Sequence, residues 1–217
     1  ELGDLITMME NLPEGKKIED CKLAFIGDAT QVCVSLMFIC SKMGMDFVQF
    51  GPKGHQITDG GLQVDTDIDL LAIGEENCKV SGGTITISDD IECIKDADFI
   101  YTDVWYGLYD EEVSGENYMD VFYPKYQINE ELMAHAPKSA WVMHYLPGNR
   151  NWEMTDAVWD GPQSALLPLG ENRLYAQRGI LVYILWPLRR NTSEYLENYY
   201  RGKVEDLLTP RIHNYDF

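Results

Sequence analysis

The stretch KLAFIGDATQVCVSLMFICSKM, residues 22–43, decides the fold. An apolar run from Lys22 to Ile26 stops at Gly27, and a longer run rich in Val, Leu, Met and Ile extends from Thr30 to Met43. The first run has the length of a strand and the second that of a helix. The stretch therefore predicts a strand, a tight turn and a helix, which together make one βα unit.

The same alternation continues along the chain. Further strands are expected at residues 46–50, 84–87, 98–101 and 141–143, and further helices at 65–78 and 170–186. Strands that alternate with helices in this way are typical of a mostly parallel, doubly wound sheet. We therefore predict an α/β, Rossmann-like fold with a C-terminal helical extension.

Composition limits the classes of partner. The chain has 217 residues, is 45% hydrophobic and carries a formal net charge of -19, so it can bury a full core in one domain. Such an acidic chain repels phosphate backbones and anionic membranes, which argues against nucleic acid as a partner. It would favour a cationic substrate at long range, although a solvated acidic surface is the preferred explanation of the charge. No run of 18 apolar residues suggests a membrane span.

The five cysteines are Cys21, Cys33, Cys40, Cys78 and Cys93. Their spacing is irregular and gives neither a Cys-x-x-Cys pair nor a zinc pattern, so no metal site is expected. We interpret them as reduced thiols, which predicts a cytoplasmic protein.

Polar segments follow several of the expected strands. They are residues 27–31, residues 103–109, the run His144-Tyr145-Leu146-Pro147 and the turn at Glu171-Asn172-Arg173. Ligands bind doubly wound sheets at the carboxyl ends of the strands, where the strand order reverses. We expect these four segments to converge there.

Taken together, these segments resemble the second half of a carbamoyltransferase, an enzyme that moves a carbamoyl group from carbamoyl phosphate to an amine. In that family the third run usually reads His-Cys-Leu-Pro, so Tyr145 replaces the cysteine. Tyr106-Gly107-Leu108-Tyr109 matches the putrescine branch, whereas ornithine enzymes carry Ser-Met-Gly after the tryptophan. Gln31 stands where ornithine enzymes carry an asparagine that holds the amino-acid carboxylate, which favours putrescine first and ornithine second.

The resemblance implies a division of the chain and a set of partners. Residues 1–186 would form the amine-binding domain, and residues 187–217 a C-terminal extension that includes a subunit-docking helix. The substrates would be a small-molecule amine and carbamoyl phosphate, and the full-length form a homotrimer. The resemblance implies no organic cofactor and no metal.

The resemblance also implies roles for individual residues. Catalytic roles fall on His144, Tyr145 and Arg173, with the Arg173 guanidinium on the carbonyl of carbamoyl phosphate. Substrate-binding roles fall on Gln31, Asp103, Trp105, Tyr106, Tyr109, Leu146 and Pro147. The Asp103 carboxylate would orient the amine, since carboxylates accept hydrogen bonds from ammonium groups, and the aromatic rings could box the cation.

Each role has a structural alternative. Asp28 is expected to cap the first long helix, ahead of a contact with substrate. Asp103 could satisfy the backbone of its own turn, Trp105 could simply pack in the core, and Arg173 could pair with Glu171. The Tyr145 phenol could fill the pocket or supply a hydroxyl in place of the thiol.

Two sequence features limit the functional hypothesis. The family's first domain carries a Ser-Thr-Arg-Thr-Arg phosphate loop and a His-Pro-Thr-Gln motif, and neither occurs here. We therefore predict a carbamoyltransferase half that is inactive without an N-terminal carbamoyl-phosphate domain. The alternative is a diverged, non-catalytic paralogue that acts as an amine-binding or protein-interaction module. A dinucleotide-binding domain is disfavoured, because the first turn lacks Gly-x-Gly-x-x-Gly.

Overall fold

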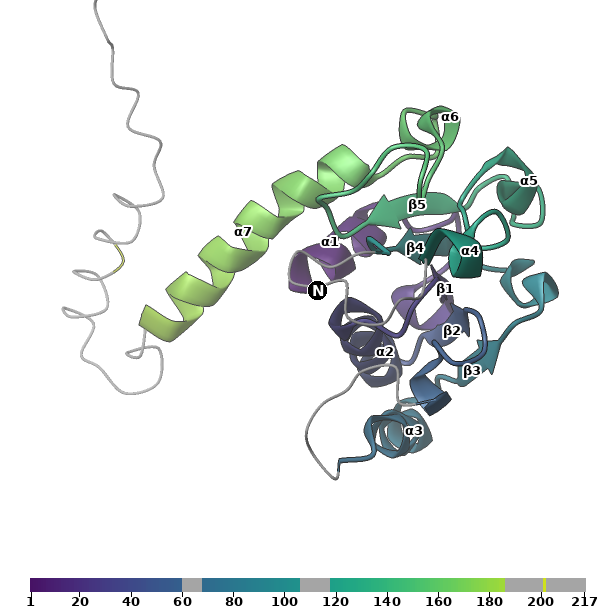
Figure 1. Ribbon diagram of the computed structural model, residues 1–217. Coiled ribbons are helices and arrows are strands. Elements are labelled where there is room, and N and C mark those ends of the chain that lie inside the picture. Colours follow the sequence, from purple (N-terminus) through teal and green to yellow (C-terminus); the bar gives the residue numbers. More distant parts are fainter. Residues whose placement is uncertain (60–67, 106–117, 186–200, 202–217) are drawn as a thin grey trace, which may run out of the picture.

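A five-stranded, all-parallel sheet forms the centre of the molecule (Figure 1). The computed structural model describes residues 1–59, 68–105, 118–185 and 201. The strands are β1 (Lys22–Ile26), β2 (Asp46–Phe50), β3 (Ile85–Ser88), β4 (Phe99–Thr102) and β5 (Trp141–His144), in the order β3-β2-β1-β4-β5. The α/β prediction is confirmed, and the expected strands are found within one residue at either end.

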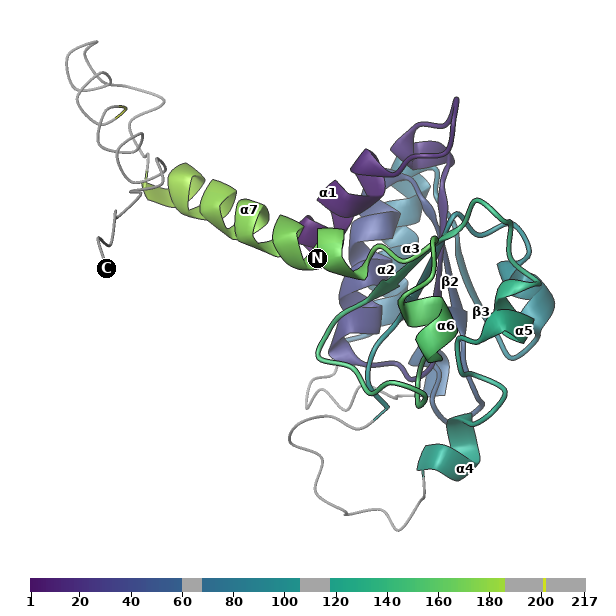
Figure 2. The same cartoon turned by 90° about the horizontal axis from the view of Figure 1, so that it is seen from above.

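Helices cover both faces of the sheet (Figure 2). One face carries α1 (Leu2–Glu10), α2 (Gln31–Met43), α3 (Leu70–Ser81) and α7 (Leu166–Leu185). The other carries the short helices α4 (Tyr118–Phe122), α5 (Glu130–Met133) and α6 (Asp156–Trp159). Single 3₁₀ turns lie at Ile18–Asp20, Ile57–Asp59 and Ile91–Ile94. None of the helices in these ranges is long and apolar enough to cross a membrane.

Successive side chains of β1 point to opposite faces of the sheet, where they join two separate layers of the core. Leu23 and Phe25 point into the layer under α2, whereas Ala24 and Ile26 point into the layer under α5 and α6. All four side chains are fully buried, as expected for a parallel strand covered on both faces. The fold thus depends on an apolar run with no polar alternation, which is what residues 22–26 supply.

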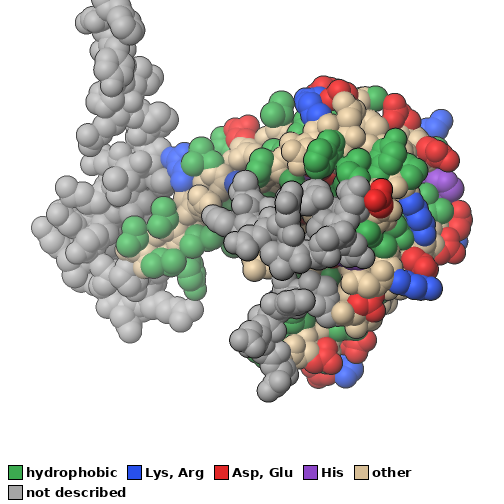
Figure 3. Space-filling model, viewed as in Figure 1, with side chains coloured by type: hydrophobic (Ala, Val, Ile, Leu, Met, Phe, Trp, Pro, Cys, Tyr) green, Lys and Arg blue, Asp and Glu red, His purple; other side chains and the backbone are tan. Residues whose placement is uncertain are grey.

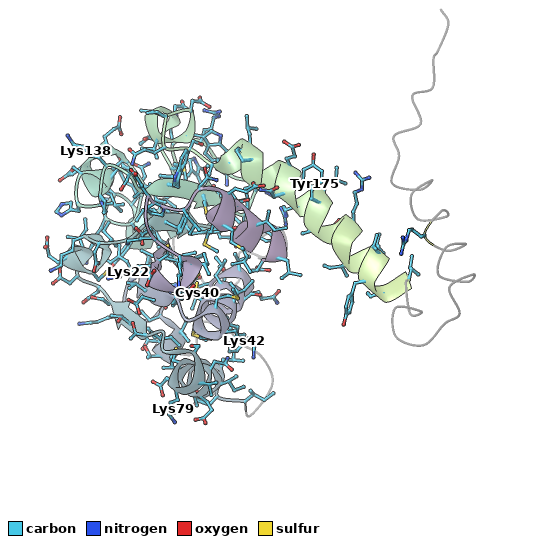
Figure 4. The ribbon with its side chains drawn as sticks, turned by 180° about the vertical axis from the view of Figure 1, so that it is seen from behind. Lys22, Cys40, Lys42, Lys79, Lys138 and Tyr175 are labelled. Carbon is cyan, nitrogen blue, oxygen red and sulfur yellow. The ribbon has the colours of Figure 1, made fainter. Side chains whose placement is uncertain are left out.

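Local capping fixes the start of α2. The Thr30 hydroxyl accepts a hydrogen bond from the Cys33 amide at 3.3 Å, and Gly44 ends the helix with a left-handed φ of 77°. The expectation that Asp28 caps this helix is therefore wrong, because Thr30 occupies the N-cap position. Cys33 and Cys40 lie buried on α2, and burial raises the pKa of both thiols. Cys40 is labelled in Figure 4.

Two other helix boundaries differ from the predictions. α3 begins at Leu70 with Asp69 as its N-cap, whereas residues 65–78 were expected to be helical. α7 begins at Leu166, four residues before the expected start at Gly170. Pro168 lies in the first turn of α7, where a missing N–H costs no helical hydrogen bond. Residues 187–217 lie outside the described part of the chain apart from Arg201, so the predicted extension stays a prediction.

α1 and α7 pack against each other as a pair. The Asn172 side chain donates to Thr7 Oγ1 at 3.0 Å and to Glu10 Oε2 at 2.7 Å. Tyr101, on β4, donates to Asp4 at 2.6 Å and so links α1 to the sheet. Beyond this contact α7 extends away from the sheet, and hydrophobic side chains near its outer end are exposed (Figures 1 and 3).

Candidate functional site

The strand order reverses between β1 and β4. From β1 the chain continues to β2 and β3 on one side, and from β4 it continues to β5 on the other. The segments after β1, β4 and β5 therefore meet at one edge of the sheet, as a doubly wound fold requires of its ligand site. A hydrogen bond of 3.3 Å from Thr30 Oγ1 to Asp103 Oδ2 joins the first two segments across this reversal.

Asp103 is held by its own turn and by the neighbouring segment. Its Oδ1 accepts from the Val104 amide at 2.8 Å, and its Oδ2 accepts from Thr30. Burial raises the pKa of the carboxyl, and these hydrogen bonds only partly oppose the shift. Asp103 thus satisfies its turn and also holds a desolvated charge at the reversal point. Gln31, the first residue of α2, is exposed.

Trp105 is packed inside the fold. Its side chain is buried and stacks on Phe122, with ring centroids 5.6 Å apart and planes at 19°. The indole Nε1 has no hydrogen-bond partner, which is rare for a buried donor. A Cβ on Gly27 would lie 4.0 Å from this nitrogen, so Gly27 keeps the space in front of the indole open. Tyr106 and Tyr109 lie outside the described residues.

Asp28 contacts a histidine that the sequence analysis did not single out. His55 Nδ1 lies 3.3 Å from Asp28 Oδ1, and the His55 ring packs edge-on against Phe122 at 5.1 Å. His55 follows the carboxyl end of β2, beyond the Gly51-Pro52 turn. Its position after the end of a strand could have identified His55 as a site residue, but it belongs to no recognised motif.

The loop after β5 is organised by His144. This side chain is fully buried, and its Nδ1 accepts a hydrogen bond of 2.9 Å from the Leu146 amide. Its Nε2 lies 3.2 Å from Glu153 Oε1. Leu146 has a φ of 56°, in the left-handed region that non-glycine residues rarely adopt, and the bond to Pro147 is cis. Glu153 is a second residue that the sequence analysis missed.

Arg173 reaches this loop from α7. Its Nη1 donates to the carbonyl oxygen of Tyr145 at 2.9 Å, and its guanidinium carbon lies 4.3 Å from the centre of the Tyr145 ring. Glu171 accepts a hydrogen bond from the Tyr175 hydroxyl at 2.7 Å. Arg173 therefore contacts the loop after β5, and not Glu171 as the structural alternative expected.

The structure brings together most of the predicted site. Asp103 and Trp105 follow β4, His144 ends β5 and residues 145–147 follow it, and Arg173 contacts this loop. In the described ranges, no three His, Cys, Asp or Glu side chains are grouped so that they could hold a metal ion.

Comparison with known proteins agrees with this geometry. The family model for the Asp/Orn binding domain of aspartate/ornithine carbamoyltransferase matches residues 19–184. Putrescine carbamoyltransferase of Mycoplasma capricolum is 42% identical over 210 residues, which cover 93% of this chain and 55% of that protein. Ornithine carbamoyltransferase of Methanococcus maripaludis is 42% identical over 184 residues, which cover 84% of this chain and 57% of that protein.

A solved structure shows the same fold. Ornithine carbamoyltransferase from Pyrococcus furiosus superposes with a TM-score of 0.70 at 34% identity, over 83% of this chain and 53% of that one. The chain therefore spans about half the length of the relatives it matches. With the sequence match, the parallel sheet and the converging strand-end segments in agreement, the chain belongs to the aspartate/ornithine carbamoyltransferase family, and its residues 19–184 correspond to the Asp/Orn binding domain.

Proposed function

We propose that this chain is the amine-binding half of a carbamoyltransferase, with putrescine as the first candidate for the amine and ornithine as the second. The observation that carries the proposal is that Asp103 lies at the reversal of strand order, after β4, while Arg173 contacts the loop after the neighbouring strand β5. An anionic and a cationic group at such an edge suit a reaction between an amine and an electron-poor carbonyl.

In the proposed reaction, the amine nitrogen attacks the carbonyl carbon of carbamoyl phosphate. A carbon–nitrogen bond forms, the bond from that carbon to the phosphate oxygen breaks, and the departing phosphate takes up the proton that the amine nitrogen loses. The tetrahedral intermediate carries negative charge on the former carbonyl oxygen. The guanidinium of Arg173 is the group proposed to stabilise it, and loss of one such donor typically costs about 2.7–4 kcal/mol.

Amine recognition is assigned to Asp103. Burial raises the pKa of this carboxyl, which reflects the cost of desolvating its charge. An ammonium group next to it would offset that cost, because an opposite charge within hydrogen-bonding distance lowers a carboxyl pKa. The formal net charge of -19 adds long-range attraction for a diamine. The proposed roles of Gln31, Trp105, Leu146 and Pro147 are to shape the pocket around this pair.

His144 and Tyr145 are assigned supporting roles. Both ring nitrogens of His144 have hydrogen-bond partners, so it is proposed to hold the loop and not to transfer a proton. The carbonyl groups of Tyr145 and Leu146 remain the candidates for contact with the carbamoyl group. Tyr106 and Tyr109 keep their proposed place beside the amine on the strength of the sequence alone.

The proposed enzyme needs a second half. The matched relatives are almost twice as long as the aligned segment, and this chain lacks the phosphate-binding motifs. We therefore assign carbamoyl phosphate to an N-terminal domain, the amine to residues 1–186, and subunit docking within a cytoplasmic homotrimer to residues 187–217. The competing proposal is a non-catalytic paralogue. The observation that favours it is that the Tyr145 ring lies against the guanidinium of Arg173.

Amine binding by the chain itself tests the proposal. Putrescine and ornithine would be titrated into the 217-residue chain while the NMR signal of the Trp105 indole N–H is followed. Putrescine is expected to shift this signal in a saturable way, and Asp103→Asn to abolish the shift. Glu76→Gln, an exposed carboxylate on α3, is the matched control. Unchanged spectra at saturating amine would refute the assignment of the amine site.

A further inference from the structure

A buried carboxylate lies behind the loop after β5. Glu153, in the turn before α6, has no solvent exposure, and its partner His144 has none either. Glu153 Oε1 lies 3.2 Å from His144 Nε2 and also accepts a hydrogen bond from the Asn149 amide. The other oxygen, Oε2, is buried without a hydrogen-bond partner.

Stability does not explain a carboxylate at this position. A buried charge must be desolvated, and an apolar side chain of similar size is often as good or better for the fold. An unpartnered buried oxygen adds to the cost. Such groups call for an explanation in terms of what they orient.

The hydrogen bonds determine the tautomer of His144. Because the Leu146 amide donates to Nδ1 at 2.9 Å, Nδ1 must be the acceptor nitrogen of the ring. The ring proton is then on Nε2, where Glu153 Oε1 accepts it. Without an acceptor at Nε2 the ring could carry its proton on Nδ1, and the Leu146 amide would lose its partner.

The tautomer in turn determines the shape of the loop. Leu146 has a φ of 56°, and the hydrogen bond from its amide to His144 is a local contact that holds this conformation. The preceding carbonyl, that of Tyr145, accepts from Arg173 at 2.9 Å. The proton on His144 is thus linked through one residue of backbone to the guanidinium on α7.

We infer that Glu153 is a positioning residue: it holds His144 in the Nε2–H tautomer and thereby fixes the loop that presents the Tyr145 carbonyl to Arg173. Its consequence for catalysis rests on the proposed function, because it concerns where the carbamoyl oxygen and Arg173 meet. The tautomer and the loop conformation do not depend on that function and are measured separately.

Nitrogen NMR of the 217-residue chain tests the inference. With ¹⁵N-labelled histidine, the ring signals of His144 should show the Nε2–H form in the parent chain. Glu153→Gln keeps a carbonyl acceptor and should retain this form. Glu153→Leu removes the acceptor and should cause its loss, together with roughly tenfold faster hydrogen exchange at the Leu146 amide, the factor expected from loss of one buried hydrogen bond.

Two further variants separate positioning from general destabilisation. Asp98→Asn removes another buried carboxylate, one that pairs with Lys16 at 2.7 Å just before β4. It should leave the His144 tautomer and Leu146 exchange unchanged. If Glu153→Leu fails to fold, Glu153→Asp is the second test. Its side chain is one methylene shorter, so the carboxylate should no longer reach His144 Nε2 and the Nε2–H form should again be lost.

The inference fails if the parent chain shows His144 protonated on Nδ1, or if a folded Glu153→Leu chain keeps both the Nε2–H form and the slow exchange. Neither readout involves an amine or carbamoyl phosphate. A chain that shows the tautomer but binds no putrescine would therefore refute the proposed function and leave the positioning role intact.

Discussion

Arg173 and Tyr145 form a two-point contact: the guanidinium lies 4.3 Å from the centre of the phenol ring and donates to the carbonyl oxygen of the same residue at 2.9 Å. The two residues are 28 positions apart in the chain. The contact joins α7 to the loop after β5. Side chain and backbone of Tyr145 thus both contact the cation that is proposed to meet the carbamoyl oxygen, and the ring restrains it.

The ring of Tyr145 is expected to contribute to stability. Tyr145→Cys removes the cation–π contact and leaves space beside the core layer under α2, so the free energy of unfolding should fall by about 1–2 kcal/mol. Tyr145→Phe keeps the ring and should change it by less than about 0.5 kcal/mol. Urea denaturation of the three chains measures both values. Equal stability of the Cys and Phe variants would show that the ring does not hold Arg173.

The same substitution has an opposite expected effect on activity. In a form extended by a carbamoyl-phosphate domain, Tyr145→Cys frees Arg173 and makes room for the attacking nitrogen. Misplacement of reacting groups by about 1 Å can cost on the order of 10²-fold, so turnover should rise within that range. Initial rates with putrescine test this, and an unchanged or lower rate would mean that the phenol is a working substitute for the thiol.

Close packing of α1 behind Arg173 leads to another prediction. A Cβ on Gly3 would lie 3.0 Å from both the Cα and the backbone nitrogen of Arg173. Gly3→Ala should therefore separate α1 from α7 and cost about 1–3 kcal/mol. Gly179→Ala is the control, because nothing lies within 4 Å of its Cβ and alanine favours a helix. Thermal unfolding that ranks Gly3→Ala at or above Gly179→Ala would contradict this packing.

Asp103 should make stability depend on pH. Burial raises the pKa of its carboxyl above 3.8, so the folded chain holds this proton more tightly than the unfolded chain. The unfolding free energy therefore falls as pH rises from near 3.8 through the folded pKa. Asp103→Asn removes that loss, so the variant should be more stable than the parent at pH 7, and the difference should shrink below pH 3.8. If Asp103→Asn is less stable than the parent at pH 7, the buried charge of Asp103 does not destabilise the fold and the prediction is wrong.

The sequence predicts the sheet well because each strand is a short run, rich in apolar or β-branched residues, between turn residues. Residues 22–26 and 46–50 are strands at the predicted positions. The start of α7 was missed because Pro168 suggests a loop, whereas proline is tolerated in a first helical turn. Asp28 was assigned to the cap that Thr30 provides, since both residue types cap helices.

The features of the site that could not be predicted from the sequence depend on contacts between segments that are distant in the chain. The strand-end rule predicts that Asp103 and the loop after β5 share one edge. It does not predict that Arg173 contacts Tyr145 and not Glu171, because that depends on how α7 packs on α1. Glu153 and His55 carried no motif, and only their contacts with His144 and Asp28 identify them.

Product formation by a joined protein tests whether this chain is the amine-binding half of a carbamoyltransferase. The chain would be joined to the N-terminal half of the Mycoplasma capricolum relative, which is 42% identical to it over the aligned region. Formation of carbamoylputrescine and citrulline from carbamoyl phosphate would then be measured, with the intact relative as a positive control. We predict no product from the 217-residue chain alone. The joined protein should have a larger kcat/KM for putrescine than for ornithine, and Arg173→Leu should lower its rate by about 10²–10³-fold. A joined protein that folds and binds carbamoyl phosphate but carbamoylates neither amine would contradict the account and favour the non-catalytic paralogue.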